Sequence, residues 1–146
     1  SMGCTTVLLA TELDLPDQVK AVVADCGFTS AWEQIKHSIK SNMRLPAFPS
    51  LYLVSLFARI FAGIRLRGCD TRKAMEKNTT VPVFFATGTR DRVVPPEMTK
   101  QNYEACRAPK MLLLTEAAHG MSYLAAKAEY EKQLEDFLEG CLKQID

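Results

Sequence analysis

The chain has 146 residues, of which 47% are hydrophobic and 24% are charged, and its formal net charge at pH 7 is +1. This composition is typical of one globular domain with a sizeable core. Acidic and basic residues are interspersed along the chain, so the overall charge gives no sign of nucleic acid or an anionic membrane surface as a partner. The five cysteines are scattered without C-x-x-C or Cys/His ligand spacing, which argues against a zinc site and a disulfide framework. Reduced thiols in a cytoplasmic compartment are therefore expected.

The first forty residues predict a helix, a strand and a second helix. Residues 1–12 read as a helix that begins with small side chains. Residues 19–26, VKAVVADC, are β-branched and apolar, as expected of a parallel strand that is buried on both faces. Ser30 is placed to cap a helix over 31–41, in which apolar side chains recur at helical spacing on one face.

Residues 50–66 form the most apolar segment of the chain. At about seventeen residues, with Arg59 and Arg65 inside it, the segment is marginal for a transmembrane span. A buried helix or a lid helix is the better interpretation. Its aromatic side chains are candidates for an apolar acyl pocket: Phe48, Tyr52, Phe57 and Phe61. A short helix over 71–77 is expected next.

The second half of the chain predicts two more strands, each followed by a helix. Residues 83–86 and 110–115 are short apolar runs that fit buried strands. Helices are expected over 97–106, after two prolines, and over 122–143. The buried face of the last helix is predicted to comprise Leu124, Ala128, Leu134, Leu138 and Cys141. Strands alternating with helices indicate the α/β class, with a parallel sheet and right-handed crossovers.

Two polar side chains follow two consecutive predicted strands. Asp91 lies on a loop just past 83–86, and His119 lies on the loop after 110–115. Open α/β sheets build their sites at the carboxyl ends of the strands. An imidazole that moves a proton and a carboxylate that orients it are two members of a nucleophilic triad. Ser1, at the start of the first predicted helix, is the candidate nucleophile.

These motifs carry a family resemblance. S-M-G at the start, G-T-R-D-x-V-V-P in the middle and A-A-H-G-M near the end resemble the second half of an α/β-hydrolase, most similar to bacterial serine esterases and prolyl-oligopeptidase-like hydrolases. The family's triad runs in the order Ser, Asp, His, and its serine lies in a G-x-S-x-G elbow. The leading Gly-x of that elbow is absent here.

The resemblance implies a fold and an activity. The fold would be a partial α/β-hydrolase, with residues 1–146 as one C-terminal portion: three parallel strands, flanking helices, a helical lid or cap insertion at about 30–78, and the first half of the sheet missing. The activity would be hydrolysis of a small ester through an acyl-enzyme, with Ser1 as nucleophile, His119 as base and Asp91 as the acid that orients it. The backbone N–H of Met2 would donate to the oxyanion. No metal and no organic cofactor would be needed.

Each candidate also has an alternative interpretation. Ser1 is alternatively a residue added in cloning, a serine without a role, or an N-terminal nucleophile whose own α-amine is the base. Asp91 suits a turn, and Asp25, which also follows a predicted strand, is a rival acid. His119 is alternatively a structural loop histidine. His37 is expected on a solvated helix surface, and the cysteines are expected to be small buried hydrophobes that lack the partner a catalytic cysteine needs.

The predicted sheet also bears on activity and partners. A second oxyanion donor in this family comes from a loop after an earlier strand, which these residues do not include. The sheet would have an open edge, which invites association. We therefore expect this chain alone to be poorly active, and to pair with a missing N-terminal half or with itself. A catalytically inactive binding or assembly domain is the competing interpretation.

Overall fold

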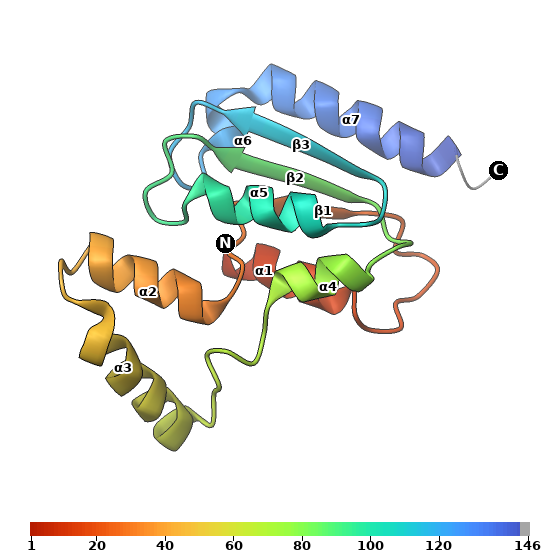
Figure 1. Ribbon diagram of the computed structural model, residues 1–146. Coiled ribbons are helices and arrows are strands. Elements are labelled where there is room, and N and C mark those ends of the chain that lie inside the picture. Colours follow the sequence, from red (N-terminus) through yellow and green to blue (C-terminus); the bar gives the residue numbers. More distant parts are fainter. Residues whose placement is uncertain (144–146) are drawn as a thin grey trace.

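The computed structural model describes residues 1–143 as a three-layer α/β arrangement (Figure 1). A parallel sheet in the order β1-β2-β3 forms the middle layer. Each strand is in register with the next, so that Val83 pairs with Val22 on one side and with Lys110 on the other. The predicted α/β class with three parallel strands is confirmed. The strands are β1 (Val22–Asp25), β2 (Val83–Gly88) and β3 (Lys110–Thr115).

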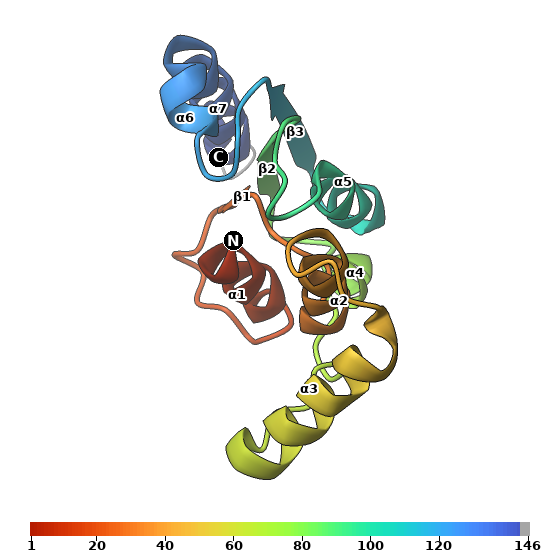
Figure 2. The same ribbon diagram turned by 90° about the vertical axis from the view of Figure 1, so that its left-hand side faces the viewer.

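Helices cover both faces of this sheet (Figure 2). Helices α1, α4 and α5 pack on one face, where Leu8, Met75 and Phe85 are fully buried. Helix α7 packs on the other face, over Phe84 and Leu113. The helices are α1 (Met2–Ala10), α2 (Ala31–Ser41), α3 (Ala47–Ala62), α4 (Thr71–Lys77), α5 (Pro96–Ala105), α6 (Ser122–Ala125) and α7 (Lys127–Lys143).

The three strands differ in burial. All six residues of β2 are buried, as expected of a central strand between two helical layers. β1 is shorter than the predicted 19–26 and, within residues 1–143, pairs only with β2. Val23 on β1 is 43% exposed, so the prediction of burial on both faces was wrong for this strand. Successive side chains of a strand point to opposite faces of the sheet, and within residues 1–143 the face of β1 that carries Val23 is only partly covered.

Local signals predicted some elements closely and one poorly. The helices over 31–41 and 71–77 and the strand over 110–115 occur with the predicted bounds, and Ser30 Oγ accepts a hydrogen bond from the N–H of Glu33 at 3.2 Å. The last helix is instead broken at Ala126, whose φ of −136° is not helical.

This break changes the buried face of the final helical region. Leu124 and Ala128, which were predicted to be buried, are exposed. Cys141 is buried as predicted. The other buried residues of α7 are Tyr130 and Phe137, which were not predicted to be buried. Their rings lie 5.7 Å from the ring of Phe84, so the aromatic contact with β2 decides which side of α7 faces the sheet.

Helix α3 extends away from the sheet (Figures 1 and 2). It ends at Gly63, which adopts a left-handed conformation with φ of 66°, and only Leu51 within it is buried. The prediction of a buried helix over 50–66 was therefore wrong, and the interpretation as a lid stays a prediction. The four aromatic side chains proposed for an acyl pocket are exposed: Phe48, Tyr52, Phe57 and Phe61.

Candidate active site

The carboxylate of Asp91 is held in place by hydrogen bonds to both of its oxygens. Asp91 lies three residues past β2, and its side chain is fully buried. Oδ1 accepts from the backbone N–H groups of Val93 at 2.8 Å and Val94 at 2.9 Å. Oδ2 accepts from Nδ1 of His119 at 2.7 Å. The residue thus forms a turn and binds the histidine with the same side chain.

The loop that carries His119 is joined to the Asp91 loop by backbone contacts. The N–H of Thr89 donates to the carbonyl of Thr115 at 2.7 Å, and the N–H of Arg90 donates to the carbonyl of Ala117 at 3.1 Å. Gly88 permits this approach, because a Cβ at that position would lie 2.1 Å from the Ala117 oxygen. The two loops therefore meet at the carboxyl ends of β2 and β3.

The ring of His119 is held in one orientation and is also partly exposed to solvent. Its Nδ1–H is committed to Asp91, while the side chain remains 26% exposed. An imidazole whose Nδ1–H is held by a carboxylate has Nε2 free to accept a proton. An imidazole and a carboxylate joined in this way can act as a base and the acid that orients it.

Ser1 lies at the same rim of the sheet, at the N-terminus of α1 (Figure 1). The first turn of α1 packs against the loop after β1: Thr5 Oγ1 donates to the Phe28 carbonyl at 3.4 Å, and Gly27 lies directly against Cys4. Ser1 is exposed, and its hydroxyl does not cap the helix. Within residues 1–143, no hydrogen bond joins Ser1 Oγ to His119. Met2 opens the helix, so its N–H has no partner within the helix.

Cys26 is a third group beside this pair that the sequence analysis missed. A ligand atom from each of Cys26, Asp91 and His119 lies within 4.8 Å of the other two. Cys26 follows β1 with a φ of 49°, and it is buried as predicted of the cysteines. Burial, and then the nearby charge of Asp25, raise the pKa of this thiol, which disfavours the reactive thiolate. A metal ion held by these three groups would require the thiolate form of Cys26.

Two other polar side chains near this site are those of Asp25 and His37. Asp25 accepts a hydrogen bond from the hydroxyl of Tyr130 at 3.4 Å, and its other oxygen is buried without a partner in the described structure. Burial raises the pKa of its carboxyl. Because His119 bonds to Asp91, Asp25 is not the acid of this pair. His37 lies on the surface as expected but is half-buried there, and its Nε2 lies 3.1 Å from the carbonyl of Arg92, the residue after Asp91.

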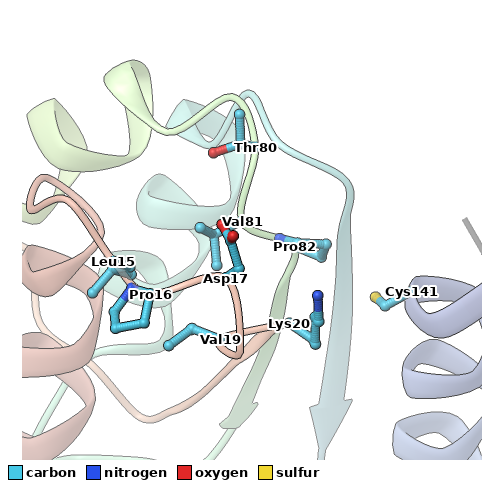
Figure 3. A pocket seen from close by; sticks show the side chains of 9 residues that line it. All are labelled: Leu15, Pro16, Asp17, Val19, Lys20, Thr80, Val81, Pro82 and Cys141. Carbon is cyan, nitrogen blue, oxygen red and sulfur yellow. The ribbon is translucent and has the colours of Figure 1, made fainter. Parts of the chain in front are cut away.

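Two hollows of similar size lie at opposite ends of the strands. One, of about 330 Å³, is lined by Ser1, Met2, Phe28, Ala31, Gln34 and Ile35. The other, of about 340 Å³, is shown in Figure 3. Its lining includes Lys20 and Pro82, which precede β1 and β2, so it lies at the amino ends of the strands. The first hollow adjoins the rim that carries Asp91 and His119. A further hollow of about 390 Å³ at this rim is lined by Asp91 itself, with His37 and Pro95 among its other residues.

Comparison with known proteins identifies the family of the chain. The serine hydrolase (FSH1) family matches residues 3–125. The uncharacterized protein YqkD of Bacillus subtilis (strain 168) is 31% identical over 140 residues, which are 95% of this chain and 46% of that protein. The chain thus spans about half the length of this relative.

Solved structures show the same fold at low identity. A Pyrococcus furiosus esterase is 21% identical, with a TM-score of 0.68 over 95% of this chain and 51% of its own. Acetyl xylan esterase 1 from Thermoanaerobacterium sp. JW/SL YS485 is 16% identical, with a TM-score of 0.60 over 97% and 43%. MGS-MChE2, an α/β-hydrolase enzyme from a sediment metagenome of the Mar Chica lagoon, Morocco, is 21% identical, with a TM-score of 0.60 over 96% and 58%. The chain therefore belongs to the serine hydrolase (FSH1) family and contains three parallel strands of an α/β-hydrolase fold.

Proposed function

We propose that Ser1, Asp91 and His119 form the catalytic triad of an esterase. The observation that carries this proposal is the 2.7 Å hydrogen bond from His119 Nδ1 to a carboxylate with no exposed surface. A structural turn needs only the two backbone N–H groups bound by Asp91 Oδ1, whereas the second oxygen is committed to the imidazole. Membership of a serine hydrolase family and a fold shared with esterases support this assignment.

The mechanism follows from the groups at the rim. His119 Nε2 accepts the hydroxyl proton of Ser1 while Oγ forms a bond to the ester carbonyl carbon. The carbonyl oxygen becomes an oxyanion, which the Met2 N–H and the N-terminus of α1 stabilise. His119 then returns the proton to the leaving alcohol as the C–O bond breaks. A water molecule repeats the sequence on the acyl-enzyme, and the carboxylic acid is released.

The hollow beside Ser1 is the candidate site for the acyl group. Phe28, Ala31 and Ile35 give it an apolar lining. Its volume of about 330 Å³ lies at the small end of the range for ligand pockets, which favours a short acyl chain. It takes the place of the acyl pocket first assigned to the aromatic side chains of α3.

We further infer that a preceding half of the protein completes the site. β1 has a free edge, and an apolar hollow of about 260 Å³ beside it is lined by Val7, Ala10, Leu15, Val19, Ala21, Val22 and Val23. The Bacillus relative is about twice as long as this chain. Strands added at this edge would cover the hollow and supply the second oxyanion donor.

Hydrolysis of p-nitrophenyl acetate tests the triad. The rate is measured for the 146-residue chain and for the chain extended by its parent's preceding half. The extended form is expected to be faster by a factor of about 10² to 10³, because one oxyanion donor contributes about that much. In either form, Ser1→Ala and His119→Gln reduce the rate to background, and Asp91→Asn reduces it by up to about 10⁴-fold. Ser50→Ala and Asp136→Asn serve as controls away from the site.

The competing function, an inactive binding or assembly domain, is favoured by one observation. Ser1 is exposed and forms no hydrogen bond with His119 within residues 1–143. An inactive domain predicts the same background rate for the extended wild type and its Ser1→Ala variant while both remain folded. That result would refute the assignment of esterase activity.

A further inference from the structure

The positive charge of the chain is concentrated in one segment. Residues 34–69 contain no Asp or Glu, although the chain as a whole has a net charge of only +1. The rest of the chain therefore carries a net negative charge. The net charge of the whole chain is therefore near zero because the two parts carry opposite charges. The basic residues of the segment are Lys36, Lys40, Arg44, Arg59, Arg65 and Arg67.

The same segment exposes the most apolar helix of the chain. Ile60 is 63% exposed and Phe61 is 79% exposed, and the apolar surface continues past the helix end to Ile64. Exposed apolar side chains on the two central turns also include Leu53, Val54, Leu56 and Phe57. α3 packs mainly on α2 and otherwise extends away from the body of the molecule (Figure 2). Contiguous apolar surface of this kind marks an interaction site.

The cations around this surface are available to a ligand. Within residues 1–143, Lys40, Arg44, Arg59 and Arg65 form no ion pair. Arg67 lies over the ring of Trp32 at 3.8 Å, and Lys36 is paired with Glu33 at 3.5 Å. Exposed Arg residues thus lie within α3 and on both sides of it. We call residues 43–67 the α3 surface.

We propose that the α3 surface binds the interface of an anionic phospholipid bilayer. Segments that lie in the interface of a membrane combine Leu and Phe with Lys and Arg. Here the helix supplies the apolar side chains and Arg59, and the residues that flank it supply Arg44 and Arg65. The apolar side chains enter the boundary of the acyl region, and the long Arg side chains extend to the lipid phosphates. None of the described helices has the length and apolar character required to cross a bilayer. In this proposal α3 lies along the surface.

The charge distribution distinguishes this occupant from a second copy of the chain. In a symmetric dimer through α3, two segments without any carboxylate would face each other, and like charges would repel. An anionic bilayer attracts the α3 surface and repels the net negative remainder of the molecule. The same charges that oppose a dimer therefore orient the protein on a membrane.

Vesicle co-sedimentation tests this proposal directly. The 146-residue chain is mixed with vesicles of phosphatidylcholine alone, or with vesicles that contain about 30% phosphatidylserine as the anionic lipid. Binding is expected to the anionic vesicles and to fall as salt is added, because salt screens exposed charges. Arg59→Gln and Arg65→Gln are each expected to weaken binding about fivefold. Phe57→Ser combined with Phe61→Ser is expected to abolish it.

Matched controls and alternative occupants complete the test. Arg107→Gln and Leu124→Ser change exposed residues elsewhere and should leave binding unchanged. Equal binding to both kinds of vesicle, or unaltered binding by the α3 variants, would overturn the proposal. A stable dimer that Phe57→Ser with Phe61→Ser dissociates would identify a second copy as the occupant instead. Loss of vesicle binding when the preceding half of the protein is restored would identify that half as the occupant.

Discussion

Replacing Gly88 with alanine should separate Asp91 from His119. The new Cβ would lie 2.1 Å from the Ala117 oxygen and 2.6 Å from its carbonyl carbon. Both atoms belong to the backbone, so no side-chain rotation relieves the clash. Ordinary contact begins at 3.4 Å, so the Ala117 carbonyl must move by about 1.3 Å. His119, two residues further along, moves with it.

The size of the effect follows from this displacement. A shift of this size that moves His119 directly away from Asp91 would lengthen the distance between His119 Nδ1 and Asp91 Oδ2 from 2.7 Å to about 4 Å. That distance is beyond hydrogen-bond range. Loss of a hydrogen bond to a charged group costs about 1.5–3 kcal/mol, and forcing extra volume into a packed site costs about 1–3 kcal/mol. Gly88→Ala should therefore lower the free energy of unfolding by about 2.5–6 kcal/mol. Misplacement of the base by about 1 Å should lower the esterase rate about 10²-fold.

Urea unfolding followed by circular dichroism measures the stability, and proton NMR of the His119 Nδ1–H reports the hydrogen bond. Gly140→Ala is the matched control, because nothing lies within 4 Å of a Cβ there. Gly140 lies in the last turn of α7, where this change should raise stability by up to about 0.5–1 kcal/mol. If Gly88→Ala unfolds within about 0.5 kcal/mol of wild type and keeps the Nδ1–H signal, the explanation for the close approach of the two loops is wrong.

Three further changes test separate parts of the account. Ala31→Phe should fill the hollow beside Ser1 and lower the rate on butyrate esters more than on acetate esters; equal losses on the two would exclude this hollow as the acyl site. Ser30→Ala should destabilise the chain by about 1 kcal/mol in urea unfolding, through loss of the cap on α2, and an unchanged midpoint would contradict that role. Because the pKa of Asp25 is raised in the folded state, the folded state binds more protons than the unfolded state, and stability should fall as pH rises from below the unfolded pKa of about 3.9 through the raised value. Unfolding titrations should show Asp25→Asn gaining stability relative to wild type over this window, and a difference that does not vary with pH would contradict the burial effect.

Local sequence signals predicted the elements that form through local interactions. Ser30 and the helical spacing of Trp32, Ile35 and Ile39 predicted the bounds of α2. Asp91 and His119 were predicted as a pair because the carboxyl ends of adjacent parallel strands must share one edge of the sheet. These predictions needed periodicity, caps and strand order, but no knowledge of side-chain packing.

The missed features depend on contacts between distant segments. Cys26 lies beside Asp91 and His119 because three loops converge, and no spacing of cysteines along the chain could show that. The buried face of α7 depends on where Phe84 places its ring and on the break at Ala126. The exposure of α3 could not be predicted either, since an apolar run looks the same whether it is covered or not.

Covalent labelling with a fluorophosphonate probe, located by mass spectrometry of the digested protein, tests the triad most directly. The probe reacts with a serine whose hydroxyl is activated by a neighbouring base. The account predicts one label, on Ser1, that disappears in His119→Gln and persists in Asp136→Asn. A folded chain that is not labelled at all, or is labelled on another serine, would contradict the assignment of Ser1 and His119 to a hydrolytic site.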